Sequence, residues 1–439
     1  MRAFTAMKAM VPLFAGLAAG QVLAYPLDGE SESGIRRLEG YQLVQQQPNG
    51  PKLSPGALWG VEQIRLHLLD YNGPDFDQLE QDPQLQAALS GMLATRDPSY
   101  SMVLVDFTDA QNVRWAGLRP DVKQNPGSVG KLLCMAGLFN ALAEAFPDPA
   151  DRQRVLMTAV SRAGSWVNDE IHIVPKWDAA ARVNRFSVIN ENDEFRLSEW
   201  LDHAISASAN GAGAIIWREA MLVKHFGSDY PQSFDVSERF FNETKKSELS
   251  ALAREVITAP LVAAGIDITN LQQGSFFTGN AKGKVPGGMS FATPRELARL
   301  LFRIEQGKLV DEWSSLQMKK YMYMTKRRYR YVYAPELSRS AVFFKSGSLY
   351  SCRPEEGFRC GKYMGNKQNL MNSVTIVEGN QPGDPRYIVT LMSDVKKVNS
   401  AWDHSRIAAA TDEMIRTRQP QKLQEEASDK EMTEAGKSE

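Results

Sequence analysis

Strand patterns lie near both ends of this chain, and helical patterns fill the long middle part. Helical spacing of apolar residues dominates from about 131 to 310. Strands need partners in a sheet, so strands on both sides of a helical stretch indicate one α+β domain whose sheet is assembled from both ends of the chain. The predicted strands cover 100–106, 112–118, 341–346, 370–378 and 386–394.

Three further elements follow from the same patterns. Leu and Met recur at helical spacing from Asp77 to Leu93, and Ala401–Arg416 has the spacing of an amphipathic helix. The helical middle is interrupted at 170–190, where two short β-rich runs predict a second small hairpin. We see no internal repeats.

Both termini differ in composition from the middle. Residues 1–24 combine a basic start with a charge-free apolar run, which is the layout of a secretory signal peptide, with an uncleaved anchor as the alternative. Residues 25–75 are rich in Gly, Pro and Gln, and predict an extended lead-in with little core of its own. Residues 419–439 predict a disordered charged tail. We therefore expect an exported protein, periplasmic or secreted, that meets the membrane only for export.

The charge and cysteine content exclude some classes of function. Lys and Arg number 51 against 52 Asp and Glu, so no clustered basic face for nucleic acid is expected. Five His and three Cys do not form a metal-site pattern, and we expect neither a metal nor a cofactor. Cys352 and Cys360 can pair in an oxidising compartment or stay free. Cys134 falls on an apolar helix and fits core packing.

The first pattern that carries chemistry is Ser128-Val129-Gly130-Lys131, at the predicted start of an apolar helix. Residues three apart share a helix face, so Lys131 is expected beside Ser128. A serine hydroxyl is a weak nucleophile that needs a base, and a lysine can serve if burial lowers its pKa. Alone, this tetrad is better explained as an N-cap serine followed by an ordinary lysine.

Two later patterns change that balance. Ser208-Ala209-Asn210 follows a helical stretch and offers a hydroxyl and an amide in one turn. Lys345-Ser346-Gly347, followed by Ser348, lies at the end of a predicted strand, where the glycine allows close approach of a ligand to the backbone. The three patterns together therefore outline one catalytic site.

In this order and context, the three motifs resemble those of the serine β-lactamases and penicillin-binding D,D-peptidases, most closely the class A β-lactamase branch. The helix start at Thr293-Pro294 and the closing strand and helix are also similar to that branch. The resemblance covers about 76–418, and it implies an antiparallel sheet built from both chain ends, an all-helical lobe at about 131–310, and an active site between them.

The resemblance also implies the role of each catalytic residue. Ser128 would be the acylated nucleophile, and Lys131 the base or proton shuttle for acylation. Ser208 and Lys345 would relay the proton to the leaving nitrogen. We expect the Lys131 amine, the Ser208 hydroxyl and the Lys345 amine to converge on the Ser128 hydroxyl, because direct proton relay requires hydrogen-bond reach.

Substrate-binding roles follow in the same way. Asn210 would contact the substrate amide, and Lys345 would attract the substrate carboxylate. The backbone N–H groups of Ser128 and Ser348 would form the oxyanion hole. Ser346 and Gly347 complete the implied substrate-binding strand.

One feature of class A β-lactamases is missing. Their Glu-x-x-Leu-Asn loop, whose glutamate activates the deacylating water, does not occur between Asn210 and Lys345. Glu243 and Glu248 lie in that interval without the Leu-Asn partner. The sequence therefore predicts acylation of Ser128 but does not predict fast release of the acyl group.

These observations predict an exported serine hydrolase that forms an acyl-serine on a β-lactam. A D,D-peptidase or related hydrolase of cell-wall peptides or esters is the first alternative, so the small-molecule partner is a β-lactam or a peptidoglycan peptide. A non-catalytic binding protein on the same fold is the second alternative. The oligomeric state is left open.

Overall fold

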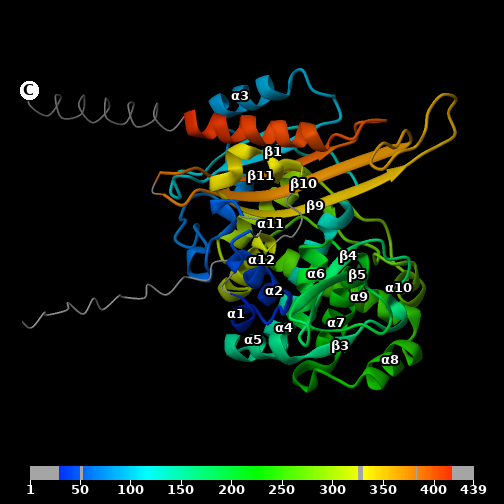
Figure 1. The fold of residues 1–439 in the computed structure, drawn as a ribbon. Helices are drawn as coiled ribbons and strands as arrows, with labels where there is room; N and C mark the ends of the chain where they lie inside the picture. The colour runs from blue at the N-terminus through cyan, green and yellow to red at the C-terminus, as the bar shows by residue number, and fades with distance from the viewer. Residues whose placement is uncertain (1–28, 50–52, 325–329, 382, 418–439) are drawn as a thin grey trace, which may run out of the picture.

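The structure, a computed structural model, centres on a five-stranded antiparallel sheet in the order β2-β1-β11-β10-β9 (Figure 1). Two strands come from the N-terminal part and three from the C-terminal part, so the expected α+β class, with a sheet built from both chain ends, is confirmed. The structure describes residues 29–49, 53–324, 330–381 and 383–417. The strands are β1 (Ser101–Asp106), β2 (Arg114–Leu118), β9 (Ala341–Ser351), β10 (Gln368–Glu378) and β11 (Arg386–Ser393).

Helices cover both faces of this sheet (Figure 1). On the outer face lie α3 (Pro83–Leu93) and the final helix, 401–417, whose apolar residues share one buried cluster with β1, β9 and β11. On the inner face lie α11 (Pro294–Glu305) and α12 (Glu312–Tyr323). Because both faces are covered, β10 is buried along nearly its whole length, its polar residues included.

The helical lobe is built around α4, which is apolar on nearly every side and buried over most of its length. It packs against α7 and α9 in the principal core. The lobe's helices are α4 (Lys131–Ala145), α5 (Pro149–Thr158), α6 (Leu197–Ile205), α7 (Asn210–Phe226), α8 (Phe234–Glu243), α9 (Lys246–Ala263) and α10 (Gly279–Lys284). Short 3₁₀ turns accompany them: η4 (Gly127–Gly130), η5 (Gly164–Trp166) and η6 (Gly227–Asp229). Two more, η7 (Arg330–Tyr333) and η8 (Pro335–Arg339), precede β9 and pack in the outer-face cluster.

The lobe is not all-helical, which corrects that part of the prediction. The expected hairpin at 170–190 is present as β4 (Ile173–Asp178) and β5 (Val183–Val188). Two more strand pairs join segments that are far apart in sequence. These pairs have only two or three residues per strand, too few to show a periodicity. They are β3 (Val160–Arg162) with β6 (Glu194–Arg196), and β7 (Leu271–Gln272) with β8 (Phe291–Ala292).

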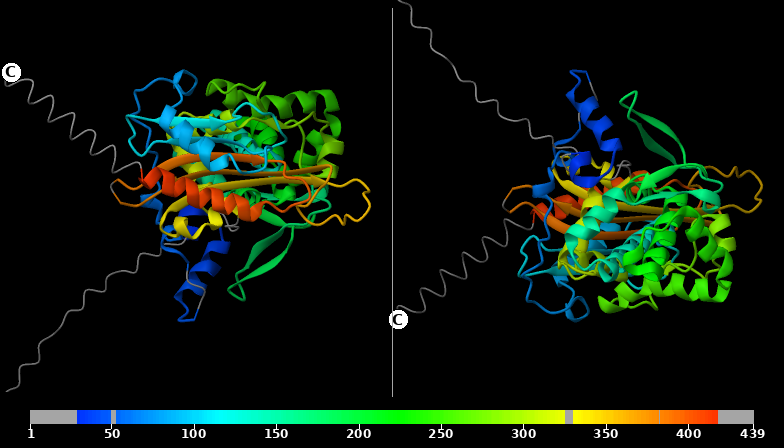
Figure 2. Two further views of the ribbon diagram at one scale, coloured as in Figure 1. Left: turned by 90° about the horizontal axis from the view of Figure 1, so that it is seen from above. Right: turned by 90° about the horizontal axis from the view of Figure 1, so that it is seen from below.

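The lead-in is helical in part, and it contributes to the core, contrary to our expectation of an extended segment. Its apolar residues are scattered among Gly, Pro and Gln, so no periodicity marks them, yet Ile35, Leu38 and Trp59 are buried in the principal core. Figure 2 shows this blue segment beside the green β4–β5 hairpin. The segment contains α1 (Glu30–Ser33), α2 (Arg37–Gln46), η1 (Pro55–Ala57), η2 (Val61–Gln63) and η3 (Phe76–Gln78).

The helix predicted from Asp77 starts later, at Pro83, because Asp82 caps it by accepting from the Leu85 N–H at 2.7 Å. The predicted signal peptide, 1–24, and the predicted tail, 419–439, lie outside the described residues. Among the helices that are described, none has the length and apolar character needed to cross a membrane.

Candidate active site

Ser128 lies in η4, directly before α4, at the junction of the sheet and the helical lobe. The turn is tightened by Asn125, whose Oδ1 accepts from the Gly127 N–H at 2.8 Å. Gly127 has φ 57°, a left-handed conformation that suits glycine. This local geometry sets Ser128 one turn before Lys131.

The Lys131 amine is fully buried and lies at the centre of the site. Its Nζ donates to Ser128 Oγ at 2.8 Å, to the Ser208 carbonyl oxygen at 3.1 Å and to Asn210 Oδ1 at 2.8 Å. The ring of Phe277 lies 4.5 Å from the same nitrogen. A Cβ at Gly213 would lie 2.6 Å from Lys131 Cε, so α7 needs a glycine there to make room for the lysine.

Ser208 lies in the turn between α6 and α7 and has φ 62°, an uncommon conformation for serine. Its Oγ accepts from Lys345 Nζ at 2.8 Å. The Lys345 amine also donates to the Ser346 carbonyl oxygen at 2.9 Å, and its side chain is buried. The Ser208 residue therefore contacts one lysine through its carbonyl and the other through its hydroxyl.

Strand β9 packs closely against η4. A Cβ at Gly347 would lie 2.0 Å from the Pro126 carbonyl oxygen, and a Cβ at Gly127 would lie 2.9 Å from the Ser348 nitrogen. Two glycines therefore bring the Ser348 backbone N–H close to the Ser128 turn. Arg330 holds this strand from the other side, since its Nη1 donates to the Gly347 carbonyl oxygen at 2.9 Å.

Glu170 secures the start of α7, which carries Asn210. Its Oε2 accepts from the Gly211 N–H at 2.6 Å, and its Oε1 accepts from the His172 N–H at 2.8 Å. Burial alone would raise the pKa of Glu170, but the hydrogen bonds from His172 and Gly211 outweigh it and hold the pKa below its usual value. An ionised carboxylate at a helix N-terminus also interacts favourably with the helix dipole.

A cleft of about 710 Å³ opens over this network, with walls from the lobe and from β9. Its charged side chains are Lys282 and Lys362, and His172 also lines it. None of the described residues that line it is an Asp or a Glu. Glu243 and Glu248, the candidates for a deacylating base, lie exposed at the end of α8 and the start of α9, outside the lining.

The predicted site residues lie together in space. Ser128, Lys131, Ser208, Asn210 and Lys345 belong to one hydrogen-bonded network. The other members of the predicted substrate-binding strand follow Lys345 on β9 and lie against the cleft or the Ser128 turn. They are Ser346, Gly347 and Ser348.

Three further residues at this site carry no motif. Glu170 and Arg330 make backbone contacts to partners that only the fold brings near. Gln273 lines the cleft, and a Cβ at Gly130 would lie 1.8 Å from its Oε1. The sequence offered only a general indication of such residues: a charged side chain that is buried needs a partner.

The structure also shows which cysteines are paired and whether possible metal ligands lie together. Cys352 and Cys360 form a disulfide in the loop after β9, with their Cα atoms 6.1 Å apart, whereas Cys134 is free and buried in α4. In the described part of the chain, no three His, Cys, Asp or Glu side chains are grouped as metal ligands. We therefore assign no residues to a metal or cofactor.

Comparison with known proteins gives matches only among solved structures. No family model matches the chain, and no curated protein is similar enough to match. A β-lactamase from Sphaerobacter thermophilus DSM 20745 is 14% identical, over 74% of this chain and 94% of that one, with a TM-score of 0.47. A class A β-lactamase representative from Bacteroides cellulosilyticus DSM 14838 is 13% identical, over 78% and 98%, with a TM-score of 0.47. The structure of PBP-A is 13% identical, over 77% and 99%, with a TM-score of 0.44.

Proposed function

We propose that this protein is an exported serine hydrolase that forms an acyl-serine at Ser128 on the cyclic amide of a β-lactam. The observation that carries the proposal is the buried Lys131 amine, which is 2.8 Å from Ser128 Oγ. This is the separation that direct proton transfer between a nucleophile and its base requires. Export rests on the predicted signal peptide at 1–24.

In the acylation step, Ser128 Oγ attacks the substrate carbonyl carbon while its proton passes to Lys131 Nζ. In its deprotonated form this amine still donates to Ser208 and Asn210, and its lone pair accepts from the Ser128 hydroxyl. The developing oxyanion is stabilised by the backbone N–H groups of Ser128 and Ser348, which the close packing of β9 on η4 supports. Preorganised donors of this kind each supply roughly 3–4 kcal/mol of transition-state stabilisation.

Collapse of the tetrahedral intermediate breaks the C–N bond, and the leaving nitrogen needs a proton. Ser208 and Lys345 supply this route, because the Lys345 amine donates to Ser208 Oγ at 2.8 Å and can replace the proton that the hydroxyl gives away. Asn210 Oδ1 accepts from Lys131, so its Nδ2 is the group that we assign to the substrate amide.

The electrostatics of the cleft favour an anionic substrate. Lys282 and Lys362 line it, Lys345 lies beneath it, and the described lining contains no acidic residue. A carboxylate that enters such a cleft meets only cations and neutral donors. β-Lactams and the C-terminal peptides of cell walls both present a carboxylate beside the scissile amide.

The second candidate is a D,D-peptidase or related cell-wall peptide or ester hydrolase. It is favoured by one observation: the described lining of the cleft holds no carboxylate that could activate a water for release of the acyl group. An enzyme of this kind would be acylated by a β-lactam and would release it slowly.

The test is a time course of chromogenic cephalosporin cleavage, with S128A as the control variant. Sustained turnover by the native protein and none by S128A is the result that the proposal predicts. A burst of one equivalent followed by slow release would select the second candidate. No burst and no turnover at saturating cephalosporin would leave a binding protein as the remaining interpretation.

A further inference from the structure

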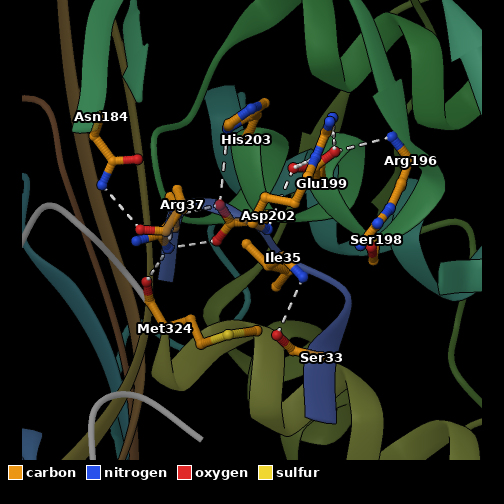
Figure 3. Close-up of polar contacts among 12 residues, drawn as sticks. Ser33, Ile35, Arg37, Asn184, Arg196, Ser198, Glu199, Asp202, His203 and Met324 are labelled. Carbon is orange, nitrogen blue, oxygen red and sulfur yellow. Dashed lines mark hydrogen bonds and ion pairs between the residues drawn. The ribbon is translucent and has the colours of Figure 1, made fainter. Parts of the chain in front are cut away.

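Two neighbouring arginines attach the N-terminal lead-in to α6, the helix that ends beside Ser208. Arg36 forms an ion pair with Glu199 at 2.7 Å and keeps 37% of its side chain exposed. Arg37 pairs with Asp202, and both side chains are 1% exposed or less. Figure 3 shows Arg37 against Asp202, with Glu199 nearby on the same helix.

The Arg37 contact is the more elaborate one. Its Nε donates to Asp202 Oδ2 at 2.5 Å, and its Nη2 donates to Asp202 Oδ1 at 2.6 Å, which makes a planar, two-pronged pair. Nη2 also donates to Ser206 Oγ at 3.3 Å and to the Met324 carbonyl oxygen at 3.0 Å. One guanidinium thus joins α6, the turn that follows it and the end of α12.

That turn leads directly to Ser208. The Ser206 N–H donates to the Asp202 carbonyl oxygen at 2.7 Å, and the Ala209 N–H donates to the His203 carbonyl oxygen at 3.0 Å. Arg37 therefore contacts Asp202, whose carbonyl accepts from the first residue of the turn, and the hydroxyl of Ser206, two residues before Ser208.

Electrostatics make this arrangement depend on the arginine. Asp202 lies in the last turn of α6, where the helix dipole disfavours a negative charge. It is also fully buried, where an unpaired carboxylate is strongly disfavoured. The Arg37 cation compensates both effects, so its loss would shift the end of α6.

We propose that Arg37 is a positioning residue for the reaction: through Asp202 and Ser206 it holds the turn in the left-handed conformation in which Ser208 meets both catalytic lysines. The inference rests on the proposed function for its kinetic meaning. The lead-in then contributes to the geometry of the active site, although Arg37 itself contacts neither substrate nor Ser128.

The test compares R37M and R37K with R36M. The R36M variant is the control, because it removes the neighbouring and more exposed ion pair between Arg36 and Glu199. The measured quantity is the rate constant for acylation by a labelled penicillin, with the folded fraction of each variant determined separately by circular dichroism so that the constant refers to folded protein. We expect at least a tenfold decrease for R37M, a smaller decrease for R37K and less than a twofold change for R36M.

Two additions separate positioning from a general loss of stability. R37M/D202N removes the unpaired buried charge. Its acylation should still be at least tenfold slower than that of the native protein, because the contacts of Arg37 with Asp202 and Ser206 remain absent. In an S208A background, R37M should have a smaller effect than in the native protein, since the Ser208 hydroxyl contact is already absent and only the carbonyl contact with Lys131 remains to be disturbed. An R37M rate equal to the native rate, or a full R37M effect in the S208A background, would overturn the inference.

If the native protein is not acylated at all, the proposed function fails, and a crystal structure of R37M/D202N then decides this inference. We expect Ser208 Oγ to have left hydrogen-bond distance of Lys345 Nζ. An unchanged 2.8 Å contact would refute the positioning role independently of any activity.

Discussion

Gln273 is the polar side chain that packs on the Ser128 turn from the segment between β7 and β8. It is 6% exposed, and its Nε2 donates to the Ser275 carbonyl oxygen at 2.6 Å. Its Oε1 lies against Gly130 and has no hydrogen-bond partner among the described residues. An amide oxygen can orient a water molecule, but it does not take a proton from one at neutral pH.

Replacement of Gln273 by glutamate should therefore supply a base for release of the acyl group. We expect Q273E to release a penicilloyl group roughly 100-fold faster than the native protein, the range of a positioned general base. The measurement is recovery of free Ser128 after acylation, followed by intact-protein mass. Q273A, which supplies no base, should show no acceleration, and equal release by Q273E and Q273A would contradict the interpretation.

At this scale, the residues that sequence could predict are those within local motifs. Ser128 and Lys131 are three apart on a helix, and their 2.8 Å contact follows from that spacing. Glu170 and Gly211 are 41 residues apart, and Arg37 and Asp202 are 165 apart. Such contacts depend on how helices and loops are packed, which no local pattern encodes.

Helix α6 combines the Arg37 contact with a buried histidine. Burial lowers the pKa of His203 to about 4, against the attraction of Asp202 and Glu199, so the ring is neutral in the folded protein. In the unfolded chain the same group titrates near 6.5. Between these values the unfolded state binds the extra proton, so stability rises with pH through this window and is lost as the pH falls from 6.5 towards 4.

The variant H203F should remove this pH dependence, because phenylalanine keeps the edge-to-face contact with Phe195 and does not titrate. We expect the decrease in unfolding free energy between pH 6.5 and pH 4 to become smaller by up to about 3 kcal/mol. Urea unfolding across that range measures it, with the exposed His225 changed in H225F as the control. Identical pH profiles for H203F and the native protein would show that His203 is not the titrating group.

The sequence predicted the helices and strands that have a long apolar pattern, and it did not predict those that lack one. Strands β1, β10 and β11 and the hairpin β4–β5 were all predicted, whereas β9 extends to Ser351, beyond the predicted end at 346. Helix α2 was missed because Leu38 is its only large apolar residue that is fully buried. The helix is stabilised instead by its arginine contacts and by packing against β4 and β5.

Over the whole molecule, a buried charge cluster joins the lead-in, the two helices on the inner face of the sheet and the sheet itself. Lys319 on α12 is fully buried and pairs with Glu305 of α11 at 2.6 Å and with Glu378 of β10. His67 of the lead-in donates its N–H to Glu305 at 3.0 Å. Burial raises the pKa of Glu305, whereas Lys319 and His67 outweigh burial at Glu378 and lower its pKa.

Removal of the central cation should make stability depend on pH in a specific direction. K319M leaves two buried carboxylates that repel, so their pKa values in the folded variant rise above the unfolded values. The variant should lose roughly 3–5 kcal/mol at pH 8 and regain part of this as the pH falls towards 5, where the carboxylates take up protons. Chemical unfolding at both pH values measures it, with the exposed Lys308 changed in K308M as the control. A loss that is equal at pH 8 and pH 5 would argue against the cluster.

The general plan of the molecule was accessible from sequence, but the lead-in's place in it was not. Strands at both chain ends predicted the sheet, and three motifs in order predicted a site beside it. The packing of Ile35 and Trp59 into the principal core, and of Arg37 under the site, involves isolated residues in a Gly- and Gln-rich segment. Their burial depends on partners more than a hundred residues away.

Peptide mapping by mass spectrometry after exposure to a penicillin tests whether Ser128 is the acylated nucleophile. We expect one equivalent of the intact penicilloyl adduct, located on Ser128 and absent from S128A. We also expect acylation to be slowed at least a hundredfold in K131A, which lacks the base. An adduct on another residue, or an unmodified Ser128 at saturating penicillin, would contradict this role of Ser128.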